Sequence, residues 1–542
     1  MARRAWSPRL WADALLAAGE RTLGSLSAPR LRVRWLVLRL LGLTLLIASA
    51  SLWTQVIALS GARGVVPFAE VLEGYARQFG PLERLWQAPT LCWLWDGDGM
   101  LHVLCAGGVL AGVLGVLNLA PRAALALGAV SYLSLASVCA PWLNFQWDAL
   151  LIESLVLGAL LAPRGLRPGL GQAQPPGRAV VFLLLFLVFR LHFESGVVKL
   201  TSGDAVWRGL RALEFHYETQ PLPSFVSAWV HGLPAWLHRG CCAAMFVIEL
   251  GAPLLLLSPW RRVRLGAAAS LLLLQVVIAA TGNFAYFNLL TFTLVLVALD
   301  DRVIPRVIWR RADIPSTSTS TSTSTSTSTS TSTSTSTSTS TRPGWGLRTR
   351  LLAAFTTLVV CVGAMQVWVA LSPRGTPRAV RKVLRLAGPP MAINSYGLFR
   401  WMTTTRDEIV IEGSDDGQRW LPYELPYKPG DPRRAPPLVA PHQPRLDWQL
   451  WFAALGECQD GHNHWVPALL QRILEQRRPV LALFARVPFP NRPPRYLRTL
   501  RYRYHFTTRA QRAVTGTWWR RQLLGQYCPT VTLVGGRLAA VD

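Results

Sequence analysis

Two short segments place charged side chains within or beside long apolar stretches. Asp148 follows Asn-Phe-Gln-Trp, and Glu153 lies about one and a half helical turns further on. Arg190 and Glu194 are four residues apart and are followed by Lys199. An ionised group at membrane depth costs at least about 2.5 kcal/mol unless it is paired or hydrated. These residues are therefore candidates for a substrate or proton site.

The same residues also allow a purely structural interpretation. Arg190 and Glu194 would share one face of a helix at this spacing, so the two side chains could neutralise each other. Buried ion pairs of this kind often hold membrane helices together. The sequence leaves both the structural and the functional interpretation open.

A third candidate is a histidine between two carboxylates. Glu214, His216 and Glu218 alternate with aromatic residues just before a proline-rich turn. A histidine beside carboxylates can act as a general base or a metal ligand. The spacing differs from the i, i+4 histidine pair of a zinc helix. An interfacial histidine that only forms hydrogen bonds is the simpler interpretation.

Motifs for hydrolytic, nucleotide-driven or zinc-dependent chemistry do not occur. The sequence has no G-x-S-x-G, no P-loop and no H-E-x-x-H. It has eight cysteines but no C-x-x-C, so no redox motif or zinc knuckle is indicated. Cys458 and Cys528 could form a disulfide in an oxidising compartment, or remain buried thiols. We therefore predict no cofactor and no metal.

The elements that must position these residues are membrane-spanning helices. Hydrophobic residues make up 51% of the 542 residues and charged residues only 16%, which is too apolar for an ordinary soluble protein. Runs of about 17 to 25 apolar residues can cross a bilayer. We predict about nine spans, at 36–58, 100–120, 123–141, 147–163, 179–198, 242–258, 263–281, 285–299 and 351–371. The runs at 147–163 and 285–299 are short, and 179–198 carries charge, so these could be tilted or re-entrant.

The distribution of arginine predicts the orientation of these spans. Seven arginines precede the first span, whereas the loop at 60–99 has three arginines and five acidic residues. Arginine collects on the cytoplasmic side of short loops, and arginine-rich loops recur on every second connection. The pattern predicts a cytoplasmic amino terminus and, with nine spans, a carboxy-terminal tail on the outer side of the membrane. Since this topology accounts for much of the net charge of +27, we predict no nucleic-acid partner.

Changes in composition divide the chain into segments. Residues 316–341 are an uninterrupted Ser-Thr alternation without apolar or charged side chains, which is typical of a disordered linker. The segments are a basic cytoplasmic leader at 1–35, a helical transmembrane part at 36–299, a cytoplasmic linker at 300–350, a last transmembrane helix at 351–371 and a soluble domain at 372–542.

The tail is predicted to be a mixed domain with more strand than helix. Alternating residues at 408–412 and 418–425 flank Ser-Asp-Asp-Gly and predict a hairpin. A helix is expected at 465–477, and strands at 479–485 and 502–506. The fold class is thus an α-helical polytopic membrane bundle followed by a soluble, strand-rich carboxy-terminal domain.

Several longer motifs, taken in order, resemble the lipase maturation factor family. They are Phe-Gln-Trp-Asp-Ala-Leu-Leu-Ile-Glu at 145–153, Ser-Gly-Val-Val-Lys-Leu at 195–200, His-Tyr-Glu-Thr-Gln-Pro-Leu-Pro at 216–223, Thr-Gly-Asn-Phe at 281–284, Asn-Ser-Tyr-Gly-Leu-Phe-Arg at 394–400, Tyr-Lys-Pro-Gly-Asp at 427–431, Pro-His-Gln-Pro-Arg-Leu-Asp-Trp-Gln-Leu-Trp-Phe-Ala-Ala-Leu-Gly at 441–456 and Trp-Trp-Arg-Arg at 518–521. The resemblance covers about residues 50 to 530 and is nearer to the second member of the family than to the first.

This resemblance implies a non-enzymatic membrane protein of the endoplasmic reticulum that helps secreted, especially homodimeric, lipases to reach their active form. It also implies client contact through a lumenal tail. The chain is rich in Ala, Leu and Arg and has no N-x-S/T sequon, which would equally suit a bacterial member in an inner membrane with a periplasmic tail. Neither the client nor the oligomeric state follows from the sequence.

Two hypotheses about the working surface remain open. In the first, the tail presents aromatic and basic side chains to clients, with Trp420, Trp448, Trp451, Trp518 and Trp519 as candidates, although most of these could instead form the core of the tail. In the second, the chain is a membrane-embedded enzyme or transporter. Its site would be a cavity in the outer leaflet lined by Asp148, Glu153, Arg190, Glu194, Lys199, His216 and Glu218.

Overall fold

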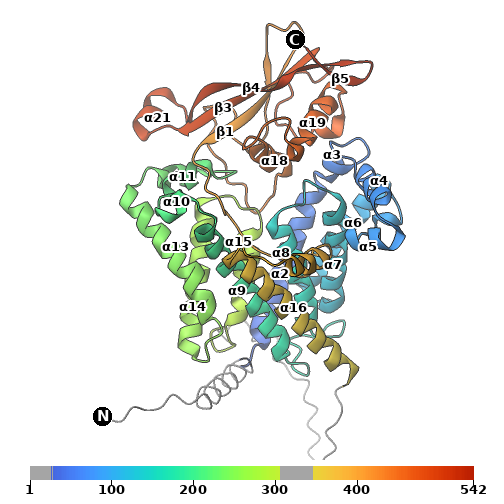
Figure 1. The fold of residues 1–542 in the computed structure, drawn as a ribbon, viewed down its shortest axis with the longest axis vertical. Coiled ribbons are helices and arrows are strands. Elements are labelled where there is room, and N and C mark those ends of the chain that lie inside the picture. Colours follow the sequence, from blue (N-terminus) through green and yellow to red (C-terminus); the bar gives the residue numbers. More distant parts are fainter. Residues whose placement is uncertain (1–25, 27, 305–345, 542) are drawn as a thin grey trace, which may run out of the picture.

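The computed structural model describes residue 26 and residues 28–304 and 346–541. A bundle of long helices forms one half of the molecule, and a sheet with short helices lies across one end of it (Figure 1). Of the leader predicted at 1–35, the structure describes only residues 26 and 28–35. The Ser-Thr repeat at 316–341, which is predicted to be a disordered linker, lies outside the described residues.

Every apolar run that was predicted to span the membrane contains a helix. Seven helices of the described chain are long and apolar enough to cross a bilayer: α2 (Leu31–Trp53), α6 (Asp98–Leu117), α7 (Pro121–Val138), α9 (Arg178–Thr201), α13 (Ala235–Leu255), α14 (Arg261–Thr281) and α16 (Leu347–Leu371). The charged run at 179–198 is thus an ordinary long helix, because its ionic side chains all turn inward.

The two runs that were noted as short form shorter helices. They are α8 (Gln146–Leu161) and α15 (Phe287–Val295), which continues as the 3-10 turn η2 (Leu296–Ala298). Both are largely buried among the long helices. Of the nine predicted spans, seven thus contain a helix of the described chain that is long and apolar enough to cross a bilayer, and the other two contain shorter helices.

Short helices connect the long ones at the end of the bundle that faces the tail (Figure 1). They are α3 (Val56–Ser60), α4 (Phe68–Gln78), α5 (Pro81–Gln87), η1 (Leu91–Trp93), α10 (Ala205–Arg208), α11 (Ala212–Thr219) and α12 (Phe225–His231). A further helix, α17 (Arg378–Ala387), follows α16.

Glycines allow α2 and α6 to pack against each other with almost no gap. A Cβ atom added at Gly112 would lie 2.6 Å from the backbone nitrogen of Leu46, and one added at Gly42 would lie 2.8 Å from that of Val116. Small residues permit this close approach between helices in membranes.

We expect Gly112→Ala to force α2 and α6 apart and to destabilise the bundle by about 1–3 kcal/mol. The unfolding temperature of the purified protein in detergent measures the effect. Gly266→Ala in α14 is the matched control, since nothing lies within 4 Å of the added methyl group. Equal stability of the two variants would show that this packing is not tight.

The first turn of α2 is closed by a carboxylate that is distant in the sequence. Asp301 accepts hydrogen bonds from the backbone N–H groups of Leu31, Arg32 and Val33 at 2.7, 2.9 and 3.0 Å. A carboxylate at this position satisfies orphan donors and complements the helix dipole. The chain segment after η2 is thereby attached to the start of the bundle.

The tail is built on a five-stranded antiparallel sheet with the order β2-β1-β3-β4-β5. The strands are β1 (Arg406–Ser414), β2 (Leu421–Tyr423), β3 (Tyr496–Phe506), β4 (Trp519–Val534) and β5 (Arg537–Ala540). The helices of the tail are α18 (Arg445–Ala453), the 3-10 turn η4 (Gly461–Asn463), α19 (Trp465–Leu474), α20 (Arg478–Leu481) and α21 (Arg509–Thr515).

The predicted hairpin joins β1 and β2. Asp416 accepts hydrogen bonds from the N–H groups of Gln418 and Arg419, both at 2.8 Å, and Gly417 has a φ of +75°. Asp and Gly are the residues that such a turn requires. The predicted helix at 465–477 corresponds to α19, and the predicted strand at 502–506 lies within β3.

The predicted strand at 479–485 is wrong. This segment contains α20 and a turn. Its only strand-like contacts in the described structure are backbone hydrogen bonds from Ala485 and the following Arg486 to Glu424, which form an isolated bridge. Within the apolar run Pro-Val-Leu-Ala-Leu-Phe, the side chains of Val480 and Leu481 are buried. A short apolar run does not by itself distinguish a strand from a buried helical turn.

Helical bundle and tail share one hydrophobic core. Trp142, from the loop before α8, packs edge-on against Trp465 of α19 with ring centroids 5.3 Å apart. Trp147 of α8 makes a similar contact with Trp448 of α18 at 4.9 Å. The tail is therefore held in a fixed position on the bundle.

Candidate functional site

A buried ion pair connects the tail to the bundle. Arg445, the first residue of α18, donates two hydrogen bonds to Asp148 at the start of α8, at 2.7 and 2.8 Å. The hydroxyl groups of Tyr132 and Tyr286 also donate to Asp148, each at 2.7 Å. All four side chains are buried. The carboxylate is thus fully bonded within the protein.

A second buried network surrounds Glu153, one and a half turns further along α8. Its partners are Arg190 of α9, which forms the ion pair, and Tyr396, whose hydroxyl donates at 2.8 Å. The backbone N–H of Asn394 donates to Glu153 at 2.9 Å, and Arg190 donates to the carbonyl of Asn394 at 2.7 Å. The segment between α17 and β1 is thereby bound to the bundle.

The possible ion pair between Arg190 and Glu194 on one helix face does not form as a direct contact. The guanidinium of Arg190 bonds across helices to Glu153, whereas Glu194 accepts a hydrogen bond from the backbone N–H of Tyr396 at 2.7 Å. Asn394 of the tail segment joins this interhelical pair, since its carbonyl accepts a hydrogen bond from Arg190 and its backbone N–H donates to Glu153.

Lys199 and His216 face an internal cavity of about 180 Å³ near the tail end of the bundle. Lys199 bonds to Glu249 of α13 at 2.7 Å. His216 stacks on Phe284 with ring centroids 6.2 Å apart. Burial and the charge of Lys199 lower the pKa of His216 to about 4, so this imidazole is neutral at physiological pH.

Glu218 lies outside this cavity and faces the tail. It accepts hydrogen bonds from the backbone N–H of Phe506 at 2.7 Å and from His505 at 3.1 Å, and His231 lies 3.8 Å away. The neighbouring Arg406 donates to the carbonyl groups of Glu218 and Pro221. The His216 motif thus forms a third connection between bundle and tail.

The candidate charged residues do not converge on one cavity. Asp148 pairs with Arg445, Glu153 with Arg190, and Lys199 with Glu249, while Glu194 and Glu218 bind the backbone of the tail. Within the described residues, no group of three or more His, Cys, Asp and Glu side chains could hold a metal ion. The contacts correspond to the interpretation in which charged groups lock elements together.

The candidate tryptophans fall into two groups. Trp448, Trp451 and Trp519 are 2%, 6% and 2% exposed, so they belong to the core and do not form an open client surface. Trp420 and Trp518 are half-buried. Arg498 covers the ring of Trp420 at 4.2 Å, and Arg512 covers that of Trp518 at 3.7 Å.

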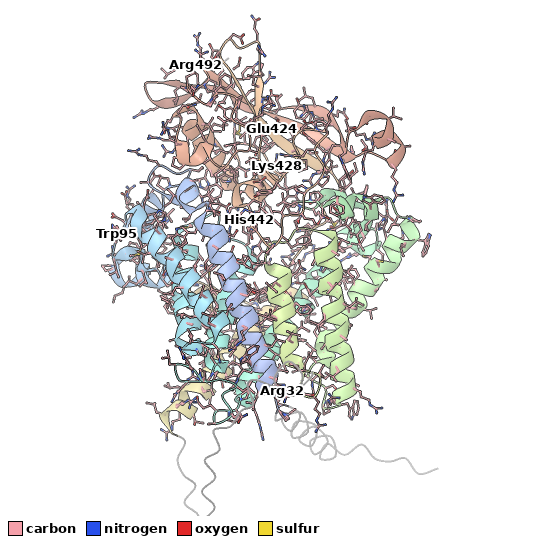
Figure 2. The ribbon with its side chains drawn as sticks, turned by 180° about the vertical axis from the view of Figure 1, so that it is seen from behind. Arg32, Trp95, Glu424, Lys428, His442 and Arg492 are labelled. Atoms are coloured by element: carbon pink, nitrogen blue, oxygen red, sulfur yellow. A yellow bond between two sulfur atoms is a disulfide. The ribbon has the colours of Figure 1, made fainter. Side chains whose placement is uncertain are left out.

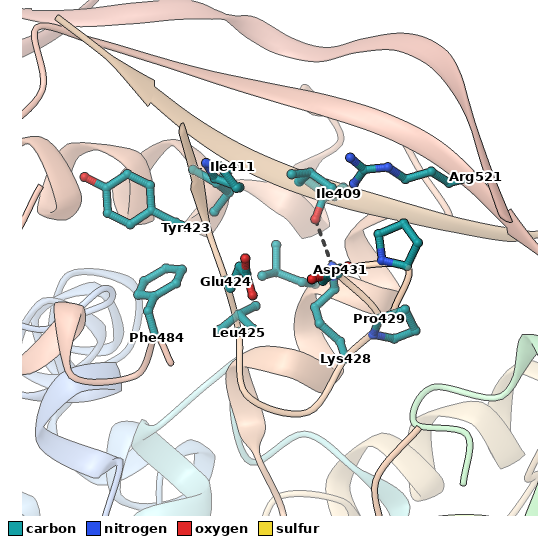
Figure 3. A pocket seen from close by; sticks show the side chains of 15 residues that line it. Ile409, Ile411, Tyr423, Glu424, Leu425, Lys428, Pro429, Asp431, Phe484 and Arg521 are labelled. Atoms are coloured by element: carbon teal, nitrogen blue, oxygen red, sulfur yellow. Dashed lines mark hydrogen bonds between the residues drawn. The ribbon is translucent and has the colours of Figure 1, made fainter. Parts of the chain in front are cut away.

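A small pocket of about 170 Å³ lies between the sheet and the segment 424–432 (Figure 3). Lys428 extends across it and donates from Nζ to the carbonyl of Ile409 at 2.8 Å, and it also pairs with Glu408. β2 pairs with β1 only at Ile411–Gly413. Lys428 therefore provides a hydrogen-bond donor for the carbonyl of Ile409, on the part of the β1 edge that β2 leaves uncovered. A lysine at this position also discourages the addition of another strand.

The opposite side of the sheet has an open edge. β5 pairs with β4 only from Val531 to Val534, and no strand of the described chain pairs with the outer edge of β4 from Arg520 to Gln526. Leu523 and Leu524, in the middle of this edge, are 53% and 42% exposed. An unpaired edge with apolar side chains can accept an extended segment of another protein.

The partners that the tail contributes to the buried charges could not be recognised in the sequence. Arg445 and Tyr396 complete the two buried networks, and both lie in motifs that support the family resemblance. Their position in a polar segment gave no sign of burial. A useful signal would have been the presence of more carboxylates than arginines within the predicted spans, since a buried carboxylate requires a partner.

The border between the two parts is visible from behind. His442 lies where α2 reaches the tail, and Arg32 lies at the other end of α2 (Figure 2). The Nδ1 atom of His442 is 2.9 Å from the hydroxyl of Ser51, and Gln55 binds the carbonyl of Gln443 at 2.8 Å. The tail thus contacts α2, α8, α9 and the segment after α14 at one end of the bundle.

Comparisons with known proteins agree with this two-part organisation. Residues 32–306 match the family model described as the lipase maturation factor transmembrane domain, and residues 392–529 match the lipase maturation factor C-terminal domain. Lipase maturation factor 2 of Homo sapiens is 35% identical, with 92% of this chain and 82% of that protein aligned. The protein of the same name from Mus musculus is 36% identical, with 90% and 81% aligned.

Similarity to lipase maturation factor 1 is lower. The Homo sapiens protein of that name is 31% identical, with 88% of this chain and 83% of that protein aligned. The chain is therefore closer to the second type than to the first. No solved structure matches it.

Proposed function

Because this chain belongs to the lipase maturation factor family, we propose that it is an integral membrane protein that assists secreted lipases, in particular homodimeric ones, to fold and assemble into active enzymes. The observation that carries this proposal is the match of both parts of the chain to the two family models. The role is that of a non-enzymatic factor that binds an immature client.

The proposal includes an orientation in the membrane. The ends of the helices remote from the tail carry many arginines, among them Arg32, Arg122, Arg164, Arg262 and Arg348. Positive charge favours the cytoplasmic side, so the tail lies in the lumen of the endoplasmic reticulum, or in the periplasm of a bacterium. The bond between Cys458 and Cys528 supports an oxidising compartment for the tail.

The client surface that we propose is the open edge of β4 at Arg520–Gln526. This edge takes the place of Trp448, Trp451 and Trp519 as the candidate client surface, because those three side chains are buried. The other edge of the sheet is covered by β2 and by Lys428, whereas Leu523 and Leu524 are accessible. An immature lipase with an unpaired strand would gain main-chain hydrogen bonds at this edge, together with apolar contacts.

Co-expression of a secreted homodimeric lipase with the full chain tests the function. We expect more lipase activity per mass of secreted lipase than with an empty vector. A membrane protein of similar size serves as the control for expression load. No increase with any homodimeric lipase tested would contradict the proposed function.

We expect Leu523→Lys/Leu524→Lys to reduce the amount of immature lipase that copurifies with the chain by about tenfold, because charges at a sheet edge oppose strand addition. The unfolding free energy should change by less than about 0.5 kcal/mol, since both residues are on the surface. Val514→Lys is the control, because Val514 is 87% exposed on α21. Unchanged copurification would exclude this edge as the client surface.

A membrane-embedded enzyme or transporter is the alternative, and the cavity beside Lys199 and His216 is the feature that favours it. A His216→Phe variant separates the two possibilities. The ring stacks on Phe284, and phenylalanine preserves this packing but removes both nitrogen atoms. The proposed function requires lipase activity to be unchanged in this variant, whereas proton chemistry at this histidine requires its loss.

A further inference from the structure

A large cavity opens at the end of the bundle that is remote from the tail. It measures about 1060 Å³ and lies between α7, α8, α9 and α16. This volume is near the upper limit for small-molecule sites, which are commonly about 300–1,000 Å³. It is separate from the cavity beside His216 and from the pocket in the tail.

Four arginines line this cavity: Arg34, Arg122, Arg164 and Arg348. No carboxylate is found among the described residues of its wall. Arg164 and Arg348 both repel Arg122 electrostatically. Arg122 also repels Arg34, but the nearby Asp301 attracts Arg34, so the uncompensated positive charge is that of Arg122, Arg164 and Arg348. The cluster therefore carries positive charge that an anion would stabilise.

The arginines differ in how far they are already bonded. Arg34 and Arg122 donate to backbone carbonyl groups, Arg34 to Leu170 and Arg122 to Ala162. Arg164 and Arg348 are exposed, and their guanidinium groups have no hydrogen-bond or ion-pair partner within the described part of the chain. These two side chains are available to a ligand.

The backbone adds to the positive field. Three helices begin beside the cavity, α7 at Pro121, α9 at Arg178 and α16 at Leu347, and none of the three has a side-chain cap. The first N–H groups of a helix are orphan donors, and the helix dipole favours an anion there. Gly177 and Leu347 are themselves part of the cavity wall.

The remainder of the wall is apolar and reaches the outer surface of the bundle. Val130 of α7, Leu160 of α8 and Leu351 of α16 line the cavity and are 47%, 40% and 62% exposed. Val130 and Leu351 lie on helices that are long and apolar enough to span a membrane, and Leu160 lies on α8, which packs among such helices. Exposed apolar side chains at this position would face hydrocarbon chains.

We propose that this cavity binds an acidic glycerophospholipid from the leaflet on the arginine-rich side. Its phosphate lies among Arg122, Arg164 and Arg348, and its acyl chains follow the apolar faces of α7, α8 and α16. The combination of a cationic end with an apolar groove matches an amphiphile with an anionic head, and basic pockets between transmembrane helices recognise such headgroups. The site does not depend on the proposed lipase function.

Lipid binding to the full chain in detergent tests this site, with native mass spectrometry as the readout. The probes are phosphatidylglycerol, phosphatidylcholine and inorganic phosphate. We expect phosphatidylglycerol to bind at least about tenfold more tightly than phosphatidylcholine, and Arg164→Gln/Arg348→Gln to abolish most of this preference. The expected preference also decreases as salt is added, because exposed charges are screened.

Arg167→Gln/Arg262→Gln is the matched control. Both residues are exposed arginines at the same end of the bundle, outside the cavity wall, and this variant removes the same charge. It should retain the preference for phosphatidylglycerol. The proposal is overturned if the two double variants lose the preference equally, if the lipids bind equally well, or if inorganic phosphate alone displaces all phosphatidylglycerol at equal concentration.

Discussion

Replacing Arg445 by glutamine is expected to destabilise the protein by about 3–5 kcal/mol. The change leaves the carboxylate of Asp148 buried without its cation, and the cost of removing one partner of a buried pair is of this size. Arg445 also joins the tail to the bundle, so the two parts should separate. Unfolding temperature in detergent and cellular abundance measure the loss.

Two further variants make this prediction specific. Arg486→Gln removes the partner of Glu424 in an ion pair near the surface, in which the side chain of Arg486 is 63% exposed and that of Glu424 is 22% exposed. This change should alter the free energy of unfolding by less than about 0.5 kcal/mol. Asp148→Leu/Arg445→Met replaces both charges by apolar groups and should recover much of the loss. If Arg445→Gln were as stable as Arg486→Gln, the ion pair would not hold the tail.

Removal of the Cys458–Cys528 bond is the second change with a large expected effect. The bond links the turn that follows α18 to β4, and the two cysteines are 70 residues apart in the sequence. A cross-link over a loop of this length stabilises the folded state by about 4 kcal/mol through the entropy of the unfolded chain. Cys458→Ser/Cys528→Ser should increase hydrogen exchange in β4 and α19.

The control is Cys361→Ser, which alters an exposed free cysteine of α16 and should leave exchange in the tail unchanged. Thiol labelling of the native protein provides an independent check of the compartment. We expect Cys458 and Cys528 to resist labelling until a reductant is added. Free thiols at both positions in the mature protein would contradict a tail in an oxidising compartment.

The helices of the bundle could be predicted because their signal is local. Length and apolar composition identify α2, α6 and α16, and the predicted boundaries deviate by a few residues. The apolar runs that form α8 and α15 could also be distinguished from full spans, because both are shorter than a helix that crosses a bilayer. The hairpin of β1 and β2 followed from Asp416 and Gly417, whose turn chemistry is equally local.

The partners of the buried charges could not be predicted, because they depend on contacts between distant segments. Arg190 has Glu194 one helical turn away, yet its partner is Glu153 from another helix. The choice is decided by Tyr396 and Asn394, some 200 residues further along the chain. Spacing within one helix carries no information about such neighbours.

The tryptophans show the same limitation. Trp448 and Trp518 were both candidates for the client surface, but the first packs against Trp147 of the bundle and the second remains half-buried beneath Arg512. The open edge of β4 also escaped prediction, because it depends on the order and length of the strands: β5 is the last strand of the sheet and covers β4 only from Val531 to Val534. Burial in a contact between two parts of a chain is a property of the tertiary structure.

These contacts also affect how the function can be dissected. A chain that ends after residue 371 would lose Tyr396 and Arg445, and Glu153 and Asp148 would remain buried without partners. Such a truncation is expected to disturb the bundle as well as to remove the tail. Point substitutions on the surface of β4 therefore give a clearer result than deletion of the tail.

Photo-cross-linking from the open edge of β4, in cells that produce a secreted homodimeric lipase, tests most directly whether this edge binds an immature client. A photoreactive amino acid is placed at Leu524, and another at Val514 on α21 as the control. We expect adducts with immature lipase from position 524 that are much stronger than those from position 514, and that disappear when the lipase is already folded. Equal adducts from both positions, or none from position 524, would contradict client binding at this edge.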